Sequence, residues 1–401
     1  MEPQRVPGTA RVLNVRQNDL TARARAAAEV ARSNAAAVDA EARFPSEAFG
    51  EIRKQRLLGI QVPQTLGGDG ASIGEIADVC YILGQACSST ALIYAMHQIK
   101  MACIVRHSKG SAAHEKILTR IAAEQLLMAS STTEGQAGGN VRSSEAAIQK
   151  DGDQVTLERK ATVISYAVEA DGIVTTARRS ADAAGSDQVL LVLLKSDYTL
   201  ERLQVWDTLG MRGTHSEGFT LRARAAADQI MPEPYERIHA QSMVPFAHLL
   251  WGSVWAGIAA AGVTKAQAFT RAAVRGANGQ MPPGAAHFTQ AVSTLRTLRG
   301  LLAGNLRSYE AVMSDEKALG GLEFQSMITL TKVQASELAV TTVLSSLRAC
   351  GLSGYRNDTE FTIGRLLRDV LSAPLMINND RILTNLATTS LMTPLPTSIS
   401  G

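Results

Sequence analysis

The segment from Met128 to Asn140 combines a run of hydroxyl side chains with closely spaced glycines. It reads Met-Ala-Ser-Ser-Thr-Thr-Glu-Gly-Gln-Ala-Gly-Gly-Asn. Backbone N–H groups that crowd together in a glycine-rich loop, with only small side chains beside them, can hold a flat polar ligand such as a flavin ring or a pyrophosphate. The same composition also occurs in ordinary turns, so the segment takes its meaning from the rest of the chain.

Three other segments stand out, and two of them carry side chains suited to the same chemistry. Residues 159–171 form a strand-like run that contains Ser165, whose hydroxyl could either contact a polar ligand or face solvent. Residues 206–219 read as a loop that enters a strand. Arg275 opens the run Arg-Gly-Ala-Asn-Gly, and a guanidinium fits phosphate oxygens in a bidentate manner.

The pattern of apolar residues changes twice along the chain. Residues from about 12 to 125 predict helices, interrupted by a Gly/Pro loop at 59–70, with helical spacing resuming over 73–107. Strand-like runs follow at 153–158, 172–177, 188–194 and 218–223. Long helical stretches return at 248–275, 286–312, 324–350 and 377–391. The order is therefore helices, a compact β unit and a helical bundle.

Composition excludes several classes of protein. The 401 residues carry a net charge of +3 without long basic runs, so nucleic-acid binding has little support. We find no apolar run of about 18 residues that could span a membrane and no signal peptide. Cys80, Cys87, Cys103 and Cys350 lack metal-ligand spacing, and we expect buried free thiols in a cytoplasmic protein.

Several motifs together resemble the acyl-CoA dehydrogenase family. Gly351–Tyr355 followed by Arg365–Asp369 resembles its C-terminal signature, residues 133–140 are similar to its Thr-Glu-Pro-Gly-Ala-Gly-Ser-Asp motif, and Leu209–Arg212 match its Leu-Gly-Met-Arg segment. The resemblance covers about residues 15 to 390. It implies a mainly α chain with a β middle domain: a helical N-terminal domain (1–125), a β-barrel-like domain (126–235) and a C-terminal four-helix bundle (236–401).

The resemblance also implies FAD, bound between the middle and C-terminal domains at a dimer or tetramer interface. In the family, the residues that match Arg275 and Arg348 reach the FAD of a neighbouring subunit, while the threonine that matches Thr133 contacts the flavin. The implied cofactor contacts are Ser131, Thr133, Gly138, Gly139, Ile164, Ser165, Arg275, Asn278, Arg348, Gly351, Leu352, Asn379 and Arg381.

The glutamate that removes the substrate's α-proton in this family is missing. Its usual position corresponds to Ile377, and the position that some members use instead corresponds to Ala247. Three residues could replace it: His97, on a helix that borders the acyl pocket in the family, Asp380, three residues after the lost glutamate, and His248. We predict His97 and Asp380 as the catalytic candidates.

The leading functional hypothesis is FAD-dependent α,β-desaturation of an acyl thioester, carried by CoA or a carrier protein, in fatty acid metabolism. The expected assembly is a homodimer or homotetramer, and an electron-transfer flavoprotein or a flavin reductase is the expected redox partner. A second hypothesis is a reduced-flavin monooxygenase on the same fold, which needs no α-proton base and in which His97 and Ser165 would serve the flavin. A third is a flavin- or acyl-binding protein without turnover.

Overall fold

Helices make up the N-terminal part of the computed structural model, which describes the backbone of residues 7–134 and 143–392 and side chains from residue 19 onward within those ranges. Ser72 begins α3 with a capping box, because its hydroxyl accepts the Glu75 N–H and its own N–H donates to the Glu75 carboxylate. The helices are α1 (Pro7–Ala40), α2 (Ser46–Lys54), α3 (Ile73–Gly84), α4 (Ser88–His107) and α5 (Ala112–Glu124). The helix expected over 73–107 is therefore broken between Gly84 and Ser88.

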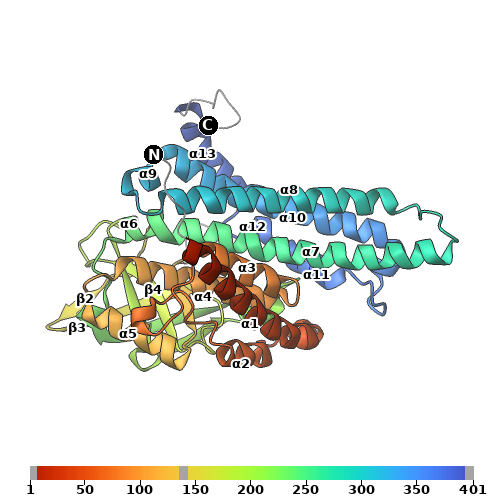
Figure 1. Ribbon diagram of the computed structural model, residues 1–401. Helices are drawn as coiled ribbons and strands as arrows, with labels where there is room; N and C mark the ends of the chain where they lie inside the picture. The colour runs from red at the N-terminus through yellow and green to blue at the C-terminus, as the bar shows by residue number, and fades with distance from the viewer. Residues whose placement is uncertain (1–6, 135–142, 393–401) are drawn as a thin grey trace, which may run out of the picture.

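Helix α4 is buried on nearly all sides, since it packs against α3, α7 and the first strand (Figure 1). Leu92, Met96, Ile99 and Lys100 recur at the spacing of one helical face. His97 belongs to a different face of the same helix, which meets the start of β1. These two faces decide which α4 side chains can reach a ligand.

The strands form two sheets. One has the order β1-β4-β5, with β1 parallel to β4, and the other is antiparallel with the order β2-β3-β7-β6. The strands are β1 (Met128–Ser131), β2 (Gln149–Asp151), β3 (Gln154–Ile164), β4 (Gly172–Arg178), β5 (Gln188–Leu194), β6 (Tyr198–Gln204) and β7 (Glu217–Ala226). The four predicted strand runs are confirmed as parts of β3, β4, β5 and β7, while β6 was missed because it is mostly exposed.

Three long helices dominate the C-terminal part, and α10 packs along both α7 and α8 (Figure 1). The elements are α6 (Tyr235–Ile238), a π-helical turn (His239–Met243), α7 (Val244–Gly276), α8 (Ala285–Val312), α9 (Glu316–Gly320), α10 (Leu322–Tyr355), α11 (Gly364–Val370), α12 (Ser372–Leu375) and α13 (Asn379–Met392). The short helices α11, α12 and α13 follow α10. The break between α12 and α13 falls at Ile377 and Asn378, which both have positive φ. We propose the domain limits 1–125, 126–235 and 236–401 on this layout.

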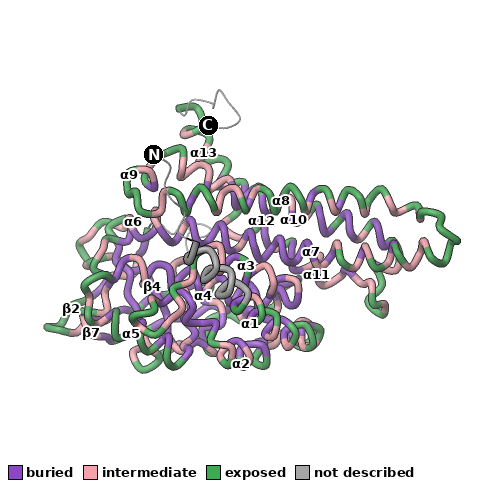
Figure 2. The backbone as a smooth tube through the Cα atoms, viewed as in Figure 1, coloured by how far each residue is buried: buried purple, intermediate pink, exposed green. Residues whose placement is uncertain are grey.

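Burial differs along the bundle. Figure 2 shows that buried backbone concentrates where α3, α4 and α7 lie beside the strands, whereas the far ends of α7 and α8 are mostly exposed or intermediate. The segment Tyr235–Gly276 is, by length and hydropathy, apolar enough to cross a membrane, which corrects the expectation that no segment qualifies. However, 83% of the most apolar 18-residue stretch of this segment is buried inside the fold. A core helix of a folded domain has the same property. The four cysteines are buried free thiols, as predicted.

Two of the sequence motifs meet at the junction of the three parts of the chain. The Met211 N–H donates to the buried Asp369 carboxylate at 2.7 Å, and Arg368 donates to the Leu209 carbonyl at 2.9 Å. Arg368 also pairs with Asp39 at the end of α1, with a contact of 2.8 Å through Nη1. Gly210 is needed here, because a Cβ at this position would lie 2.2 Å from the Arg368 carbonyl oxygen.

Replacing Gly210 by alanine should therefore loosen this junction. We expect Gly210→Ala to lower the free energy of unfolding by roughly 2 kcal/mol or more, as overpacking against backbone does. Urea unfolding followed by circular dichroism measures this. Gly304→Ala on α8 is the matched control, because no atom lies within 4 Å of its added Cβ, and it should raise stability by about 1 kcal/mol. Equal effects of the two substitutions would contradict the close contact.

Candidate active site

A cavity of about 580 Å³ lies where the three parts of the chain meet. Its wall is formed by one face of α4, the ends of β1 and β3, the loop before β7, the start of α7, and α11 with α12. This volume is within the range of pockets that hold small molecules. The lining is mostly apolar, and a group of hydroxyl side chains lies on the side of the strands.

The polar side of the pocket is a set of hydroxyls. Thr132 and Thr133 follow β1, and Ser165 follows β3. The hydroxyl of Ser165 lies 2.8 Å from that of Ser216, which lies 2.8 Å from that of Thr214. These side chains converge because the two strand ends and the loop before β7 reach the same edge of the β unit.

The direction of this hydroxyl chain follows from its last member. Thr214 donates its single hydroxyl hydrogen to the Met211 carbonyl at 2.9 Å, so Ser216 must donate to Thr214. Ser165 must then donate to Ser216. The Ser165 oxygen is left with lone pairs only, and it faces a pocket ligand as a hydrogen-bond acceptor.

Strand geometry separates the predicted cofactor contacts into two sets. Thr133 and Ser165 line the pocket, whereas Ser131 and Ile164 do not. Alternate residues of a strand face opposite sides, so Ser131 and Ile164 are fully buried behind the wall that their neighbours form. Gly138 and Gly139 lie outside the described residues.

The two ends of the predicted glycine-rich loop are joined by Glu134. Its carboxylate accepts hydrogen bonds from the Ser144 hydroxyl at 3.0 Å, from the Ala146 N–H at 3.2 Å and from the Glu145 N–H. It also forms an ion pair at 3.2 Å with Arg159, which is 1% exposed. Glu134 therefore fixes where the loop leaves and rejoins the β unit.

Both positions at which the family carries its glutamate lie on the pocket wall. Ile377 and Ala247 are both lining residues, and both are apolar. Among the described residues that line this cavity, none is aspartate or glutamate. A ligand in the cavity therefore meets no carboxylate base from this part of the chain.

His97 does not line this cavity. Its Nδ1 accepts the Met128 N–H at 3.0 Å and its Nε2–H donates to the Leu58 carbonyl at 2.8 Å, so both ring nitrogens are engaged with the backbone. Burial lowers the pKa of His97 to about 4, and the ring is neutral at pH 7. We propose that His97 joins α4 to β1 structurally instead of acting as a base.

The candidates on α13 also lie outside the cavity lining. Asp380 is exposed, while Asn379 is buried and fully engaged. Asn379 accepts from the Lys332 Nζ at 2.6 Å and donates to Ser336 and Glu337. Arg381 donates to the Ile377 carbonyl. We propose that Asn379 positions the start of α13 and does not contact a cofactor in the same chain.

The predicted contacts for the adenosine diphosphate half of FAD lie at the far end of the bundle (Figure 1). Arg275 is 24 residues beyond Trp251 on α7, which is roughly 36 Å along the helix. All five are exposed: Arg275, Asn278, Arg348, Gly351 and Leu352. They cannot contact a ligand in this chain's own cavity, so the predicted role requires a second copy of the chain.

Basic residues of the cavity were only partly found from the sequence. His248 lines it, donates from Nδ1 to the Ile328 carbonyl, and has a pKa lowered by burial to about 4. Arg368 lines it and is paired with Asp39. Lys100, which the sequence reasoning missed, lines it too and is 3% exposed. The spacing of Lys100 from Leu92 and Met96, which places all three on one face of the helix, could have indicated that Lys100 faces the same side as these two apolar residues.

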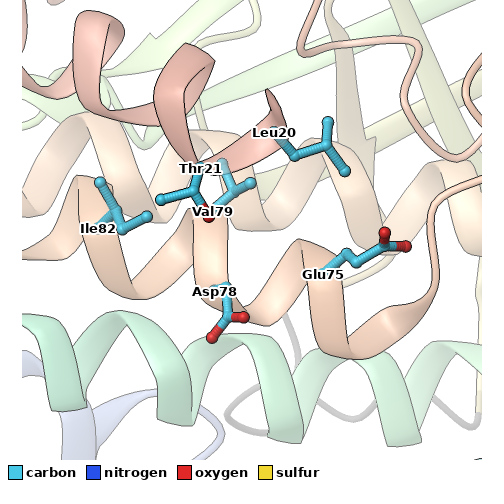
Figure 3. Close-up of a pocket in the computed structure, with 6 residues that line it drawn as sticks. All are labelled: Leu20, Thr21, Glu75, Asp78, Val79 and Ile82. Atoms are coloured by element: carbon cyan, nitrogen blue, oxygen red, sulfur yellow. The ribbon is translucent and has the colours of Figure 1, made fainter. Parts of the chain in front are cut away.

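A second depression lies between α1 and α3, where Figure 3 shows Leu20 and Thr21 of α1 beside Val79 and Ile82 of α3. It has no volume in which a water molecule would fit. It therefore serves as a helix–helix contact and not as a ligand site.

The neutral state of His97 generates a prediction about acid stability. Its folded pKa of about 4 lies below the ordinary 6.5, so its contribution to stability is present above pH 6.5 and is lost as pH falls towards 4. This loss amounts to roughly 3 kcal/mol. Urea unfolding of His97→Gln should therefore show a shallower loss of stability between pH 7 and 4 than the wild type.

Exposed His287 on α8 provides the control, because His287→Gln changes the same side chain without a buried partner. It should leave the pH dependence of unfolding unchanged. If His97→Gln and the wild type lose stability equally between pH 7 and 4, the buried neutral imidazole is not a stabilising element.

Comparison with known proteins agrees with this architecture. Residues 16–125 match the family model described as acyl-CoA dehydrogenase, N-terminal domain. The chain is 25% identical to the probable acyl-CoA dehydrogenase fadE25 of Mycobacterium leprae (strain TN) over 88% of this chain and 89% of that protein. It is 26% identical to the L-evernosamine nitrososynthase of Micromonospora sp. (strain ATCC 39149 / NRRL 15099 / SCC 1413) over 86% of this chain and 82% of that protein.

Among solved structures, the FMN-bound dibenzothiophene monooxygenase TdsC of Paenibacillus sp. A11-2 superposes with a TM-score of 0.82. The alignment covers 94% of this chain and 98% of that one at 16% identity, so it carries information on the fold. The family resemblance drawn from the sequence motifs is thereby confirmed. Residues 16–125 are an acyl-CoA dehydrogenase N-terminal domain, and the chain as a whole has the fold of the acyl-CoA dehydrogenase family of flavoenzymes.

Proposed function

We propose that this protein is a monooxygenase that uses reduced flavin delivered by a separate flavin reductase. The observation that carries the proposal is the absence of any carboxylate among the described residues that line the cavity, with Ile377 and Ala247 at both positions where the family places its base. Abstraction of an α-proton requires a positioned general base. Oxygen transfer to an electron-rich substrate does not.

The cavity wall fits the ring system of a flavin. Hydroxyls of Thr132, Thr133 and Ser165 provide a polar edge, and apolar side chains of α4 and α7 provide the opposite face. When bound, reduced flavin supplies the two electrons with which one atom of molecular oxygen enters the substrate and the other leaves as water. The residues of the chain hold the ring, orient the substrate and exclude bulk water.

The directed hydroxyl chain supports the reduced state in particular. Reduced flavin carries ring N–H donors that oxidised flavin lacks, and the Ser165 oxygen is an acceptor because its hydrogen is committed to Ser216. In oxidised flavin the corresponding ring nitrogen is an acceptor without hydrogen. It would face the lone pairs of the Ser165 oxygen and form no hydrogen bond with them. The pocket is thus better matched to a flavin that arrives reduced.

The comparisons also support this proposal. The FMN-bound neighbour is a monooxygenase by name, and one relative is a nitrososynthase. FMN needs none of the adenosine diphosphate contacts that the predicted FAD would require from Arg275 and Arg348 of a second copy. FMN is therefore the flavin to test first.

The second candidate is α,β-desaturation of an acyl thioester, which the family-model match and the fadE25 relative favour. The proton would then need another acceptor. Lys100, whose pKa burial lowers to about 8, is the residue of the described lining best able to become one. This reaction would transfer hydride to oxidised flavin and needs no oxygen.

The preference for reduced flavin can be measured on the protein alone. Ser216→Ala removes the hydroxyl to which Ser165 donates, so the Ser165 hydroxyl becomes free to donate to the flavin. The preference of the variant for reduced over oxidised FMN should therefore fall roughly tenfold. Anaerobic titration of both forms gives the two dissociation constants, and their ratio gives the shift in reduction potential. Ser390→Ala, at an exposed position on α13, is the control. A ratio that is unchanged in Ser216→Ala would contradict the directed chain.

The reaction class is tested with a supplied flavin reductase, NADH and FMN. Sulfur-, nitrogen- and carbon-centred substrates are incubated under oxygen-18, and products are analysed by mass spectrometry. We expect one labelled oxygen atom per product molecule and no product without oxygen. Turnover of acyl thioesters to enoyl thioesters under anaerobic conditions, with oxidised flavin and an artificial electron acceptor, would establish the second candidate instead.

A further inference from the structure

Lys100 is a buried cation on the wall of the active-site cavity that the proposed oxygen chemistry does not use. It shares one face of α4 with Leu92, Met96 and Ile99. Its Nζ donates to the Met243 Sδ at 3.1 Å, and Met243 lines the same cavity. Lys100 forms no ion pair with a carboxylate of the described residues.

The surroundings of Lys100 do not compensate its charge. A thioether sulfur is a weak hydrogen-bond acceptor. The nearby Cys103 thiol is neutral, because burial raises its pKa to about 11. Lys100 itself has a pKa lowered by burial to about 8 and is mostly protonated at pH 7. A buried ammonium in such a place is unfavourable unless a ligand supplies an anion.

Besides His239, the cavity lining holds two other basic groups, and both are already satisfied or neutral. Arg368 is paired with Asp39, and the buried His248 ring is neutral at pH 7. The indole Nε1 of Trp251, another lining residue, is buried without a hydrogen-bond acceptor among the described residues. The cavity therefore presents uncompensated positive charge and a free donor in a mostly apolar wall.

We propose that Lys100 binds an anionic group of the substrate, so that the substrate is an organic monoanion with an apolar body. A carboxylate, sulfinate or sulfonate would receive a charge-assisted hydrogen bond from Nζ. The apolar body would lie against the α4 and α7 side chains of the cavity. This assignment rests on the proposed function only in taking the cavity as the substrate site.

The test compares two ligands of matched shape, the anion 1-naphthoate and the neutral amide 1-naphthamide, by isothermal titration calorimetry at pH 7 with saturating FMN. We expect the wild type to bind naphthoate roughly 10- to 100-fold more tightly, the range of a charge-assisted hydrogen bond in a dry site. Lys100→Met, which removes the ammonium and keeps an unbranched apolar chain of similar length, should abolish the preference and still bind naphthamide. Lys116→Met on the exposed face of α5 removes one positive charge elsewhere and should change neither constant.

Equal binding of the two ligands by the wild type, or an unchanged preference in Lys100→Met, would overturn the proposal. So would a Lys100→Met variant that loses affinity for FMN itself, because the lysine would then bind the flavin phosphate. Retained naphthamide binding shows that the variant is folded. None of these measurements needs oxygen or turnover, so failure of the monooxygenase reaction and failure of anion binding are seen separately.

Discussion

The hydrogen bond from the Met211 N–H to the buried Asp369 carboxylate joins the middle and C-terminal parts of the chain at the cavity, and the neighbouring Arg368 pairs with Asp39 of the N-terminal part. Burial raises the pKa of Asp369 above its ordinary value, and the N–H donor counteracts this by stabilising the ionised form. Met211 is in the left-handed region, with φ at 54°, and its carbonyl accepts from both Trp206 and Thr214. One peptide segment therefore joins α11, the cavity wall and the hydroxyl chain that ends at Ser165.

In this arrangement, the residues that join the parts of the chain are different from the residues at the family's two glutamate positions. The junction residues that make the fold, Gly210 and the pair Arg368–Asp369, belong to motifs that resemble those of the acyl-CoA dehydrogenase family. Two residues that face the cavity are different, since Ile377 and Ala247, which the resemblance places where the family has its glutamate, are apolar. A pocket whose described lining has no acid but has a buried lysine favours anionic ligands and cannot assist proton removal as a carboxylate would. The same fold can thus serve a reaction in which electrons come from the flavin and not from the substrate.

Much of the architecture could be predicted from the sequence because periodicity and turn residues are local signals. The apolar run 188–194 became β5, and the helical spacing of 324–350 became part of α10. The charged edge strand β6 gave no such signal, since its side chains are mostly exposed. The motif Leu209–Arg212 and the pair Arg368–Asp369 were recognisable separately, but their contact across more than 150 residues depends on tertiary packing.

Site residues were harder to predict because orientation, not identity, decides their role. Ser165 was found and lines the cavity, while its neighbour Ile164 faces the opposite side. His97 carries the right chemistry but is turned to the backbone of Leu58 and Met128, whereas Lys100, three residues later, faces the cavity. Because nearly the whole circumference of α4 is buried, its sequence shows no polar and apolar faces. The sequence therefore could not indicate whether His97 or Lys100 faces the cavity.

The most direct test of the central claim is the visible spectrum of the flavin-loaded, oxidised protein during anaerobic addition of butyryl-, isovaleryl-, octanoyl- and palmitoyl-CoA. Because no carboxylate lines the described part of the cavity, we expect the flavin absorbance to remain unbleached with every thioester. Ile377→Glu, which restores a carboxylate at the family's position, is the internal comparison. Bleaching of the wild type by any of these thioesters would contradict the account and establish the protein as a dehydrogenase with a different base.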